Sequence, residues 1–487
     1  MSSDAPGRDG DQDGGDAPGR DDEPPADRAP RIRPVLDPGF TPAFLARRAM
    51  ARRVRRSGVG VPVALAVEQP DGSASLRETI VFPQGHPGSA ASYRDCERLL
   101  KFMLWARGGH RVHVDGPAAL LEALVRHYAE TPTGMFDARL EDEFYGRGFA
   151  VVRTPRSAFP TAPEARASAG GHRDGCRIGF DLGASDRKVA AVIDGEVVFS
   201  EEVAWDPSRH ADPQWHFDEI MASLRAAAAH LPRVDAIGGS AAGVYVGDEV
   251  RAASLFRSVP RDLFETRVRG MFAEIRHAWG DVPLVVANDG DVTALAGSLQ
   301  AGAGALLGIA MGSSEAAGYV TREGHLTSWL NELAFAPVDH APDAPVDEWS
   351  GDRGCGALYF SQQATGRLLG PAGLAGDAPE ALPARLVFLQ ERMADDDPRA
   401  ADVYRTIGTY LGYGILHYAD FYEIEHILLL GRVMTGRGGD LVSDGAREVL
   451  RAEEPATAER ITFHTASERD KRHGQAVAAA GLPGIPA

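Results

Sequence analysis

The chain has 487 residues, of which 44% are hydrophobic and 25% are charged. This is enough apolar material for two or three domains with cores of their own. The 51 Lys and Arg residues against 69 Asp and Glu give a formal net charge of -18, which argues against nucleic-acid binding because that requires cations to displace the counterions of phosphates.

The first segment, residues 1–30, is acidic, rich in Pro and Gly, and nearly free of large apolar side chains. Such a segment cannot bury enough surface to offset its conformational entropy, so we expect a disordered acidic tail. It lacks the apolar core of a signal peptide, and no apolar run long enough to span a membrane follows it. The three cysteines are few and far apart, which is typical of a reducing compartment. We therefore expect a cytoplasmic protein that does not contact membranes.

Residues 31–157 are expected to form a small α/β domain, whose function the pattern does not reveal. The basic stretch Arg47–Arg56 has the charge of a DNA-binding helix, but predicted strands follow it directly where a second helix would be needed. We therefore favour a solvated basic surface. The predicted helices are 40–56 (capped by Thr41), 96–105 and 117–128, and the predicted strands are 61–67, 77–82 and 110–114.

The composition changes at residues 158–174, which form a linker rich in Pro, Ala and Gly. Three short strands with tight turns follow, and helices then alternate with strands in two successive sets. This pattern predicts an α/β protein with two lobes, residues 175–302 and 303–487, and a cleft between them. The predicted strands are 176–182, 188–194, 196–203, 234–237, 283–287, 305–311, 318–321 and 426–430, and the predicted helices are 217–229, 263–279 and 291–299.

The first segment with chemical potential is GFDLGASDRKVAAV, residues 179–192, where an acidic residue and a glycine stand at a turn between two strands. Glycine lets the backbone approach a phosphate closely, and Ser185 and Lys188 can donate hydrogen bonds to it. Asp181 can hold Mg²⁺ through water. Taken alone, this segment is more typical of an ordinary hairpin turn.

A buried strand in the second segment, residues 285–294, ends in Asn288-Asp289 and runs into a helix. A carboxylate at the carboxyl end of a strand can take a proton from a substrate hydroxyl. The alternative is that Asp289 or Asp291 only caps the helix.

Two glycine-containing turns complete the set. Gly312, Ser313 and Ser314 form a small-residue turn between strands, which suits a second phosphate. The late strand 426–430 ends at Gly431, as is needed where a base and a sugar lie against the backbone.

In this order the segments resemble the ROK family (repressor, open reading frame, kinase) of the sugar kinase and actin-like ATPase superfamily. The family's corresponding motifs read D-x-G-G-T, N-D and G-T-G, with a late strand that ends in glycine, and residues 353–361 resemble its R-G-C-x-x-x-Y-x-S segment. The resemblance covers about the C-terminal two thirds of the chain. It implies a two-lobed actin-like ATPase (ribonuclease H-like) fold and ATP-dependent phosphorylation of a sugar-like substrate. It further implies that Asp289 is the general base, that Asp181 positions Mg²⁺ through water, that ATP is held by Asp181, Gly183, Ser185, Lys188, Gly312, Ser313, Ser314 and Gly431, and that Asn288 and Glu332 bind the sugar.

The sequence departs from this family at the sugar site. The family's E-x-G-H becomes Glu332-Leu333-Ala334-Phe335, and Ala357 stands where a Glu is expected. Only Cys355 remains of the zinc-binding cysteines, so we expect no structural zinc. A site that loses two hydroxyl-reading side chains should change its substrate, which favours another sugar, an amino sugar or a cyclitol. The polar stretch 339–352 either supplies replacement ligands, with Trp349 stacking on a sugar, or is a surface loop.

Three functions remain open. The favoured one is a carbohydrate kinase, and a homodimer is among its expected assemblies. The alternative is a non-catalytic ROK-like sugar sensor, in which the N-terminal domain passes ligand binding on to a partner. The third is another ATPase of the same superfamily without a sugar substrate. Turnover that depends on Asp289 separates the first function from the second.

Overall fold

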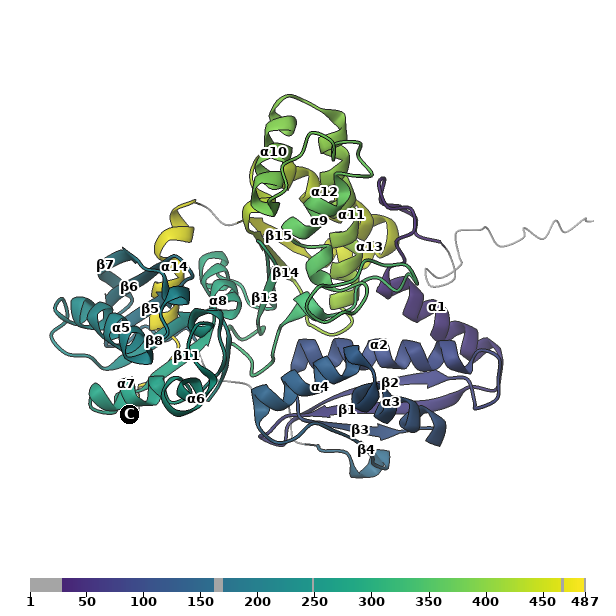
Figure 1. Ribbon diagram of the computed structural model, residues 1–487, viewed down its shortest axis with the longest axis horizontal. Helices are drawn as coiled ribbons and strands as arrows, with labels where there is room; N and C mark the ends of the chain where they lie inside the picture. The colour runs from purple at the N-terminus through teal and green to yellow at the C-terminus, as the bar shows by residue number, and fades with distance from the viewer. Residues whose placement is uncertain (1–28, 162–169, 248, 466–467, 486–487) are drawn as a thin grey trace, which may run out of the picture.

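The computed structural model describes residues 29–161, 170–247, 249–465 and 468–485. Within these ranges the chain forms two lobes and an N-terminal domain (Figure 1). The expected disordered tail lies outside the described residues except at its end, and half of the expected linker, 162–169, does so too. No helix in the described ranges is long and apolar enough to cross a membrane.

The N-terminal domain is a four-stranded sheet in the order β2-β1-β3-β4, with β3 and β4 parallel and the other pairs antiparallel. The first helix begins after Pro42 with no side-chain cap, so the predicted cap at Thr41 is wrong. The sequence also did not predict α4 or β4. The elements are α1 (Ala43–Arg56), β1 (Val61–Glu68), β2 (Ala74–Val81), α2 (Ser89–Arg107), β3 (Arg111–Asp115), α3 (Ala118–Glu130), α4 (Pro132–Tyr145) and β4 (Ala150–Arg153).

The first lobe is built on a five-stranded sheet in the order β11-β8-β5-β6-β7. The central strand β5, its neighbour β8 and the edge strand β11 run parallel. On the other side of β5, β6 and β7 continue the sheet as an antiparallel meander. Every residue of β5 is buried, as expected for a strand covered on both faces. The elements are β5 (Cys176–Leu182), β6 (Asp186–Ile193), β7 (Glu196–Ala204), α5 (Pro213–Ala228), β8 (Ala236–Ala241), β9 (Val244–Val246), β10 (Glu249–Ala252), α6 (Arg261–Leu263), α7 (Met271–Ala278), β11 (Leu284–Asn288) and α8 (Asp289–Ala301).

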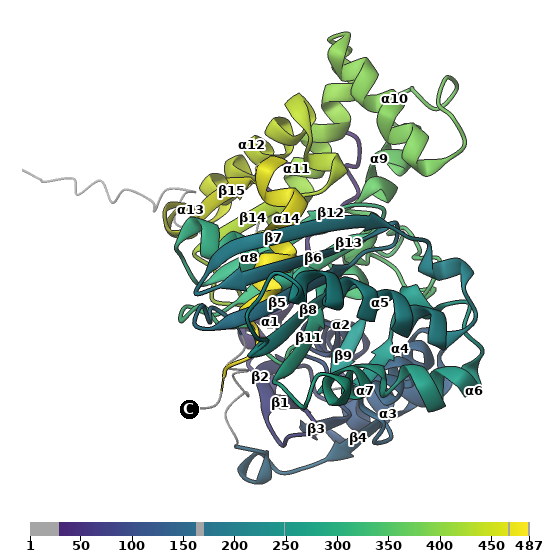
Figure 2. The same ribbon diagram turned by 90° about the vertical axis from the view of Figure 1, so that its left-hand side faces the viewer.

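The second lobe has a four-stranded sheet in the order β13-β12-β14-β15, in which β12, β14 and β15 run parallel. Helices α11 and α12 pack against each other over it, and Figure 2 shows this helical layer above the sheet. The elements are β12 (Leu306–Met311), β13 (Glu315–Val320), α9 (Gln362–Leu368), α10 (Leu382–Ala394), α11 (Pro398–Tyr418), β14 (His426–Leu430), α12 (Gly436–Glu453), α13 (Pro455–Arg460) and β15 (Thr462–Thr465).

The last helix, α14 (Glu468–Ala480), returns to the first lobe and packs against β5, β6, β8 and α8. The prediction that residues 303–487 form one lobe did not anticipate this return. The first lobe is therefore assembled from two parts of the chain that are far apart in sequence.

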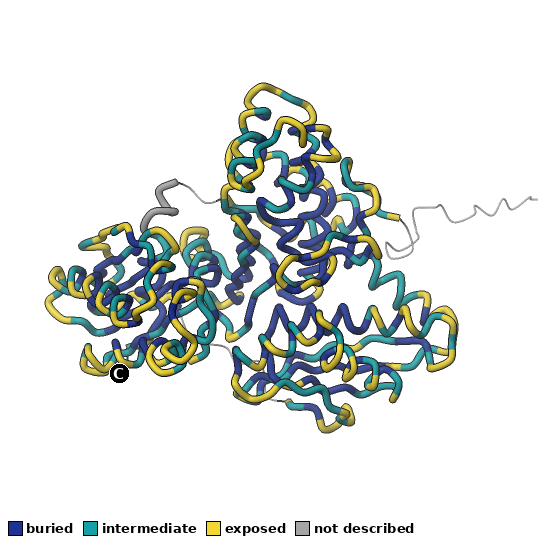
Figure 3. Tube along the Cα trace, in the orientation of Figure 1, coloured by how far each residue is buried: buried dark blue, intermediate teal, exposed yellow. Residues whose placement is uncertain are grey.

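The N-terminal domain and the second lobe share one continuous hydrophobic core, whereas the sheet of the first lobe has a core of its own. Figure 3 shows that α2 and the inner parts of the second lobe are largely buried. Residues preceding α1 also lie on that lobe, where the Tyr410 hydroxyl donates to Asp37 over 2.5 Å. The N-terminal domain is thus joined to the second lobe by packing as well as by covalent continuity.

Candidate active site

Two of the predicted site carboxylates stand at the same edge of the first-lobe sheet. Asp181 lies near the carboxyl end of β5, and Asp289 follows directly on β11, with β8 between these two parallel strands. The β8 residue opposite Asp181 is Ser240, whose hydroxyl donates to the Asp181 carboxylate over 2.6 Å. Parallel strands bring their carboxyl ends to one edge, which is where ligands of α/β sheets bind.

Asp289 is partly buried at the first turn of α8. Burial and the like charge of Asp181 raise the pKa of Asp289 to about 6. Two carboxylates that repel each other in a partly desolvated position are typical of catalytic sites. Asp289 is therefore suited to accept a proton near neutral pH.

The cap of α8 is Asn288, whose side-chain oxygen accepts from the Gly290 amide over 2.7 Å. Its amide nitrogen donates to the Gly243 carbonyl over 2.8 Å. The Asp289 carboxylate also accepts from the Gly290 amide, over 3.0 Å. Asp291 caps nothing, because it is buried and accepts from the Asn331 side chain over 2.9 Å.

The first predicted phosphate loop joins β5 to β6. The Gly183 amide donates to the Asp186 carbonyl over 2.9 Å, and the Trp205 indole donates to the Gly183 carbonyl over 2.8 Å. The Lys188 ammonium lies 2.8 Å from Asp186 and 3.6 Å from Asp181. Ser185, at the tip of the loop, is exposed. The loop is thus held in shape from within, and it places a cation beside Asp181.

The second predicted phosphate loop joins β12 to β13, and the Gly312 amide closes it by donating to the Ser314 carbonyl over 3.0 Å. Ser313 and Ser314 are exposed at its tip. Gly431 has φ +98° and lies against the backbone of Met311, where a Cβ atom would be 2.5 Å from the Met311 oxygen. Only glycine fits this close approach. The late strand is thereby brought against the second loop.

The pKa of Glu332, the other predicted sugar ligand, also depends on Asp289. Burial and the charge of Asp289 raise the pKa of Glu332 to about 7. We call Asp181, Asp289 and Glu332 together the acidic edge. It gathers residues from three separate segments of the sequence.

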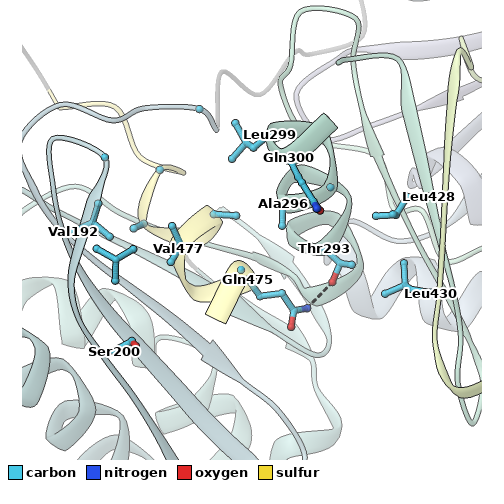
Figure 4. Close-up of a pocket in the computed structure, with 18 of the residues that line it drawn as sticks. Val192, Ser200, Thr293, Ala296, Leu299, Gln300, Leu428, Leu430, Gln475 and Val477 are labelled. Carbon is cyan, nitrogen blue, oxygen red and sulfur yellow. Dashed lines mark hydrogen bonds between the residues drawn. The ribbon is translucent and has the colours of Figure 1, made fainter. Parts of the chain in front are cut away.

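A cavity of about 840 Å³ lies between the lobes. Figure 4 shows that α8 and α14 separate its two sides, with β6 and β7 of the first lobe on one and β14 of the second on the other. Of the predicted site residues Gly431 lines it, and the other predicted residues are not among its lining. The lining includes Val192, Ser200, Thr293, Ala296, Leu428, Leu430, Gln475 and Val477.

Side chains of the polar stretch 339–352 form contacts within the fold. Asp339 accepts from the Tyr359 hydroxyl over 2.7 Å and from the Thr41 amide over 2.9 Å. Asp352 lies 2.8 Å from Arg98 and 3.0 Å from Lys101 of the N-terminal domain. Trp349 is 78% exposed. The surface-loop interpretation therefore fits Trp349, and the two carboxylates serve to hold the stretch and the N-terminal domain in place.

Three further residues at the acidic edge were not predicted. Ser240 bonds Asp181, and burial together with the Asp289 charge raises the pKa of Tyr245. Gln475 of α14 donates to Thr293 of α8 (Figure 4) and to the Asp289 carbonyl, the latter over 3.4 Å. The strand pattern around Ser240 gives a faint signal, but nothing local indicates that α14 reaches this edge.

In the described ranges no group of three or more His, Cys, Asp and Glu side chains is placed to hold a metal ion. A magnesium ion bound with a nucleotide needs fewer protein ligands, because it keeps several waters and uses phosphate oxygens. The Asp181 carboxylate fits that requirement.

Comparison with known proteins identifies the fold. The chain matches a ROK hexokinase from Thermus thermophilus with a TM-score of 0.50 and 18% identity, over 63% of this chain and 97% of the hexokinase. It matches a ROK family transcriptional regulator, a homologue of the Escherichia coli MLC protein, with a TM-score of 0.50 and 20% identity, over 63% of this chain and 77% of the regulator. No family model and no curated protein matches the sequence. The chain thus has the two-lobed actin-like fold of ROK proteins, as predicted, and that fold is found in both a kinase and a regulator.

Proposed function

We propose that this protein is an atypical ROK-type kinase of the cytoplasm that transfers the γ-phosphoryl group of ATP to a hydroxyl of a sugar or sugar-like substrate. The observation that carries the proposal is the partly buried Asp289, whose pKa burial and the Asp181 charge raise to about 6. A structural cap would not need this environment, and Asn288 already caps α8. A general base does need it, because its pKa should lie near the working pH.

In the proposed reaction the Asp289 carboxylate takes the proton of the acceptor hydroxyl. The acceptor oxygen forms a bond to the γ-phosphorus as the bond from that phosphorus to the bridging oxygen breaks, and ADP leaves. Such a transfer depends mainly on positioning and on neutralising charge. Asn288 and Glu332 orient the acceptor hydroxyls in this scheme.

We place the phosphates of the nucleotide between the two turns, near Lys188 on one side and Gly312, Ser313 and Ser314 on the other. Asp181 would hold Mg²⁺ through water, and the ion would supply charge neutralisation at the transferred group. The base and ribose extend into the cavity that Gly431 lines, whose walls at Leu428, Leu430 and Ala296 are apolar. Pockets for flat ligands are typically lined in this way.

The acceptor is expected to differ from glucose, because Leu333, Ala334 and Phe335 follow Glu332 where the family carries its histidine. The second candidate is a sugar-sensing regulator, favoured by the match to the ROK regulator. It would bind its ligand at the same edge without turnover.

The deciding experiment measures ADP release with Mg-ATP against hexoses, amino sugars, sugar acids and cyclitols. We expect one class of acceptor to support turnover, and Asp289→Asn to lower kcat by about 10²- to 10⁴-fold, the usual contribution of a general base. The matched control is Asp281→Asn, which removes an exposed carboxylate from the turn before β11. It should leave kcat unchanged.

The opposite result is also informative. If no acceptor supports turnover while a sugar raises the melting temperature by binding the native state, the kinase assignment is wrong and the regulator is supported.

A further inference from the structure

The segment that carries Glu332 is held by the N-terminal domain. The amides of Leu330, Asn331 and Glu332 donate to the carbonyls of Arg107, Ala106 and Trp105 at the carboxyl end of α2, over 3.2, 3.2 and 3.0 Å. The last carbonyls of a helix have no partner within the helix. These three thus find their donors in the loop of the second lobe that forms part of the acidic edge.

Side chains of the N-terminal domain fix the same loop. The Arg107 guanidinium lies 3.4 Å from the ring centre of Trp329 and 4.5 Å from that of Tyr422, and it donates to the Phe421 carbonyl. The Gln69 amide donates to the Ser328 carbonyl over 3.2 Å. A buried cation between two aromatic rings is a strong and directional contact.

Asn331 connects this loop to the helix that begins with Asp289. Its amide nitrogen donates to Asp291 of α8 over 2.9 Å, and its oxygen accepts from the Tyr422 hydroxyl over 3.0 Å. Its backbone has φ +53°, which Asn tolerates better than most residues. The carboxyl end of α2 is therefore connected to α8 through one buried amide side chain.

The same end of the domain also contacts the first lobe, because Gly108 after α2 lies against Tyr145 at the end of α4. Helix α4 packs against the hairpin β9–β10, and the Arg251 guanidinium lies beside Gly146 at the end of α4. Val244 of that hairpin belongs to the core shared by the N-terminal domain and the second lobe. Glu143 and Arg261 form an ion pair of 3.0 Å along the same contact. Tyr245, whose pKa is raised by burial and by the charge of Asp289, lies in this hairpin.

We propose that the N-terminal domain is a built-in part of the acceptor site, with Arg107 and Gln69 as positioning residues for Glu332. The domain reaches the acidic edge from both lobes, through the loop 328–332 and through the hairpin β9–β10. This role rests on the proposed kinase function. It differs from that of a separate sensor module, because the domain acts on acceptor binding directly and not on a distant partner.

This role predicts that the variants change the binding of the acceptor but not the binding of the nucleotide. Loosening the loop misplaces Glu332 and lowers the affinity for the acceptor. The proposed phosphate loops lie on other segments, 183–188 and 312–314, so the affinity for nucleotide should stay unchanged. If the domain had only a structural role, the affinities for the acceptor and for the nucleotide would fall together, because the whole lobe would be disturbed.

The test compares Gln69→Ala and Arg107→Leu with Arg156→Leu, an arginine of the same domain that lies 5.6 Å from the Phe159 ring and pairs with exposed Glu78. For the first two variants we expect kcat/KM for the acceptor to fall by about 10- to 100-fold, the scale of a small misplacement. We expect the KM for Mg-ATP to stay within about twofold. Hydrogen exchange of amides 330–332 should become faster, and the control should match the wild type in all three measurements.

Each outcome separates the inference from the kinase assignment. If both variants leave the acceptor constants unchanged, or if the acceptor and Mg-ATP constants worsen together, the positioning role is wrong and the kinase stands. If the wild type turns over no acceptor, the proposed function is wrong and the inference is lost with it. Arg107 is buried, so if Arg107→Leu does not fold, Gln69→Ala alone decides.

Discussion

At the scale of single residues, the chemistry is concentrated in carboxylates that the fold keeps partly out of water. Asp181 is buried and bonded by Ser240, and it raises the pKa of its neighbour Asp289 in addition to the effect of burial. Burial and the charge of Asp289 in turn raise the pKa of Glu332. Placing like charges together costs stability, so such a group of carboxylates is typical of sites that bind ligands or catalyse reactions.

This environment predicts how activity depends on pH. Asp289 accepts a proton only when it is ionised, and its pKa is about 6. As the pH increases toward 6, we expect kcat/KM for the acceptor to increase about tenfold with each pH unit. Above pH 7 it should be constant. Initial rates from pH 5 to 8 with saturating Mg-ATP would measure this. A profile that stays flat from pH 5 upwards would show that Asp289 is not the base.

At the scale of elements, the position of α14 depends on the absence of side chains on the sheet beneath it. A Cβ atom at Gly179 of β5 would lie 1.8 Å from the Ala476 oxygen, and one at Gly238 of β8 would lie 1.7 Å from the Ala479 oxygen. Helix and sheet therefore touch backbone to backbone. This approach lets Gln475 reach Thr293 and the first turn of α8.

The close approach predicts the effect of one added methyl group. Gly238→Ala should push α14 off the sheet and lower the stability by about 1–3 kcal/mol, the usual cost of overpacking. Denaturant unfolding measures this directly. Gly376→Ala is the matched control because this exposed loop glycine has nothing within 4 Å of its added Cβ, and it should be neutral or slightly stabilising. Equal stability of the two variants would contradict the packing argument.

At the scale of the whole molecule, several buried carboxyl groups link folding to pH. Burial raises the pKa of Asp291 and of Glu315 to about 8 in the folded protein. In the unfolded chain both groups titrate near pH 4. Between these values the unfolded state holds fewer protons, so stability falls as pH rises. Asp352 acts in the opposite direction, since Lys101 and Arg98 overcome its burial and hold its pKa at about 2, and its contribution is lost only as pH falls below 4.

We therefore expect the greatest stability between about pH 4 and 6, and a melting temperature several degrees lower at pH 8.5 than at pH 6. Glu315→Gln should reduce this difference, because it removes one of the groups that must ionise in the interior. Glu380→Gln, at an exposed position, is the control. Scanning calorimetry across this pH range measures the effect. A melting temperature that rises toward pH 8.5 would contradict it.

Local patterns in the sequence predicted much of this fold. The alternation of strands and helices, the glycine turns and the Asn288-Asp289 strand end predicted the two-lobed fold, which the comparison with ROK structures confirms. These features were accessible because strand length, turn residues and the residue after a strand are set by neighbours in the chain. The assignment of the individual site residues stays a prediction.

The tertiary structure alone decided which of these parts meet. It placed Ser240 opposite Asp181, Gly431 against Met311, α14 on the first-lobe sheet, and the end of α2 against the Glu332 loop. Each contact joins segments separated by tens to hundreds of residues. It depends on strand order, register and the packing of complementary surfaces, which no local pattern of side chains contains. The sequence predicted most residues of the candidate site, and packing placed the end of α2 against the segment that carries one of them, Glu332.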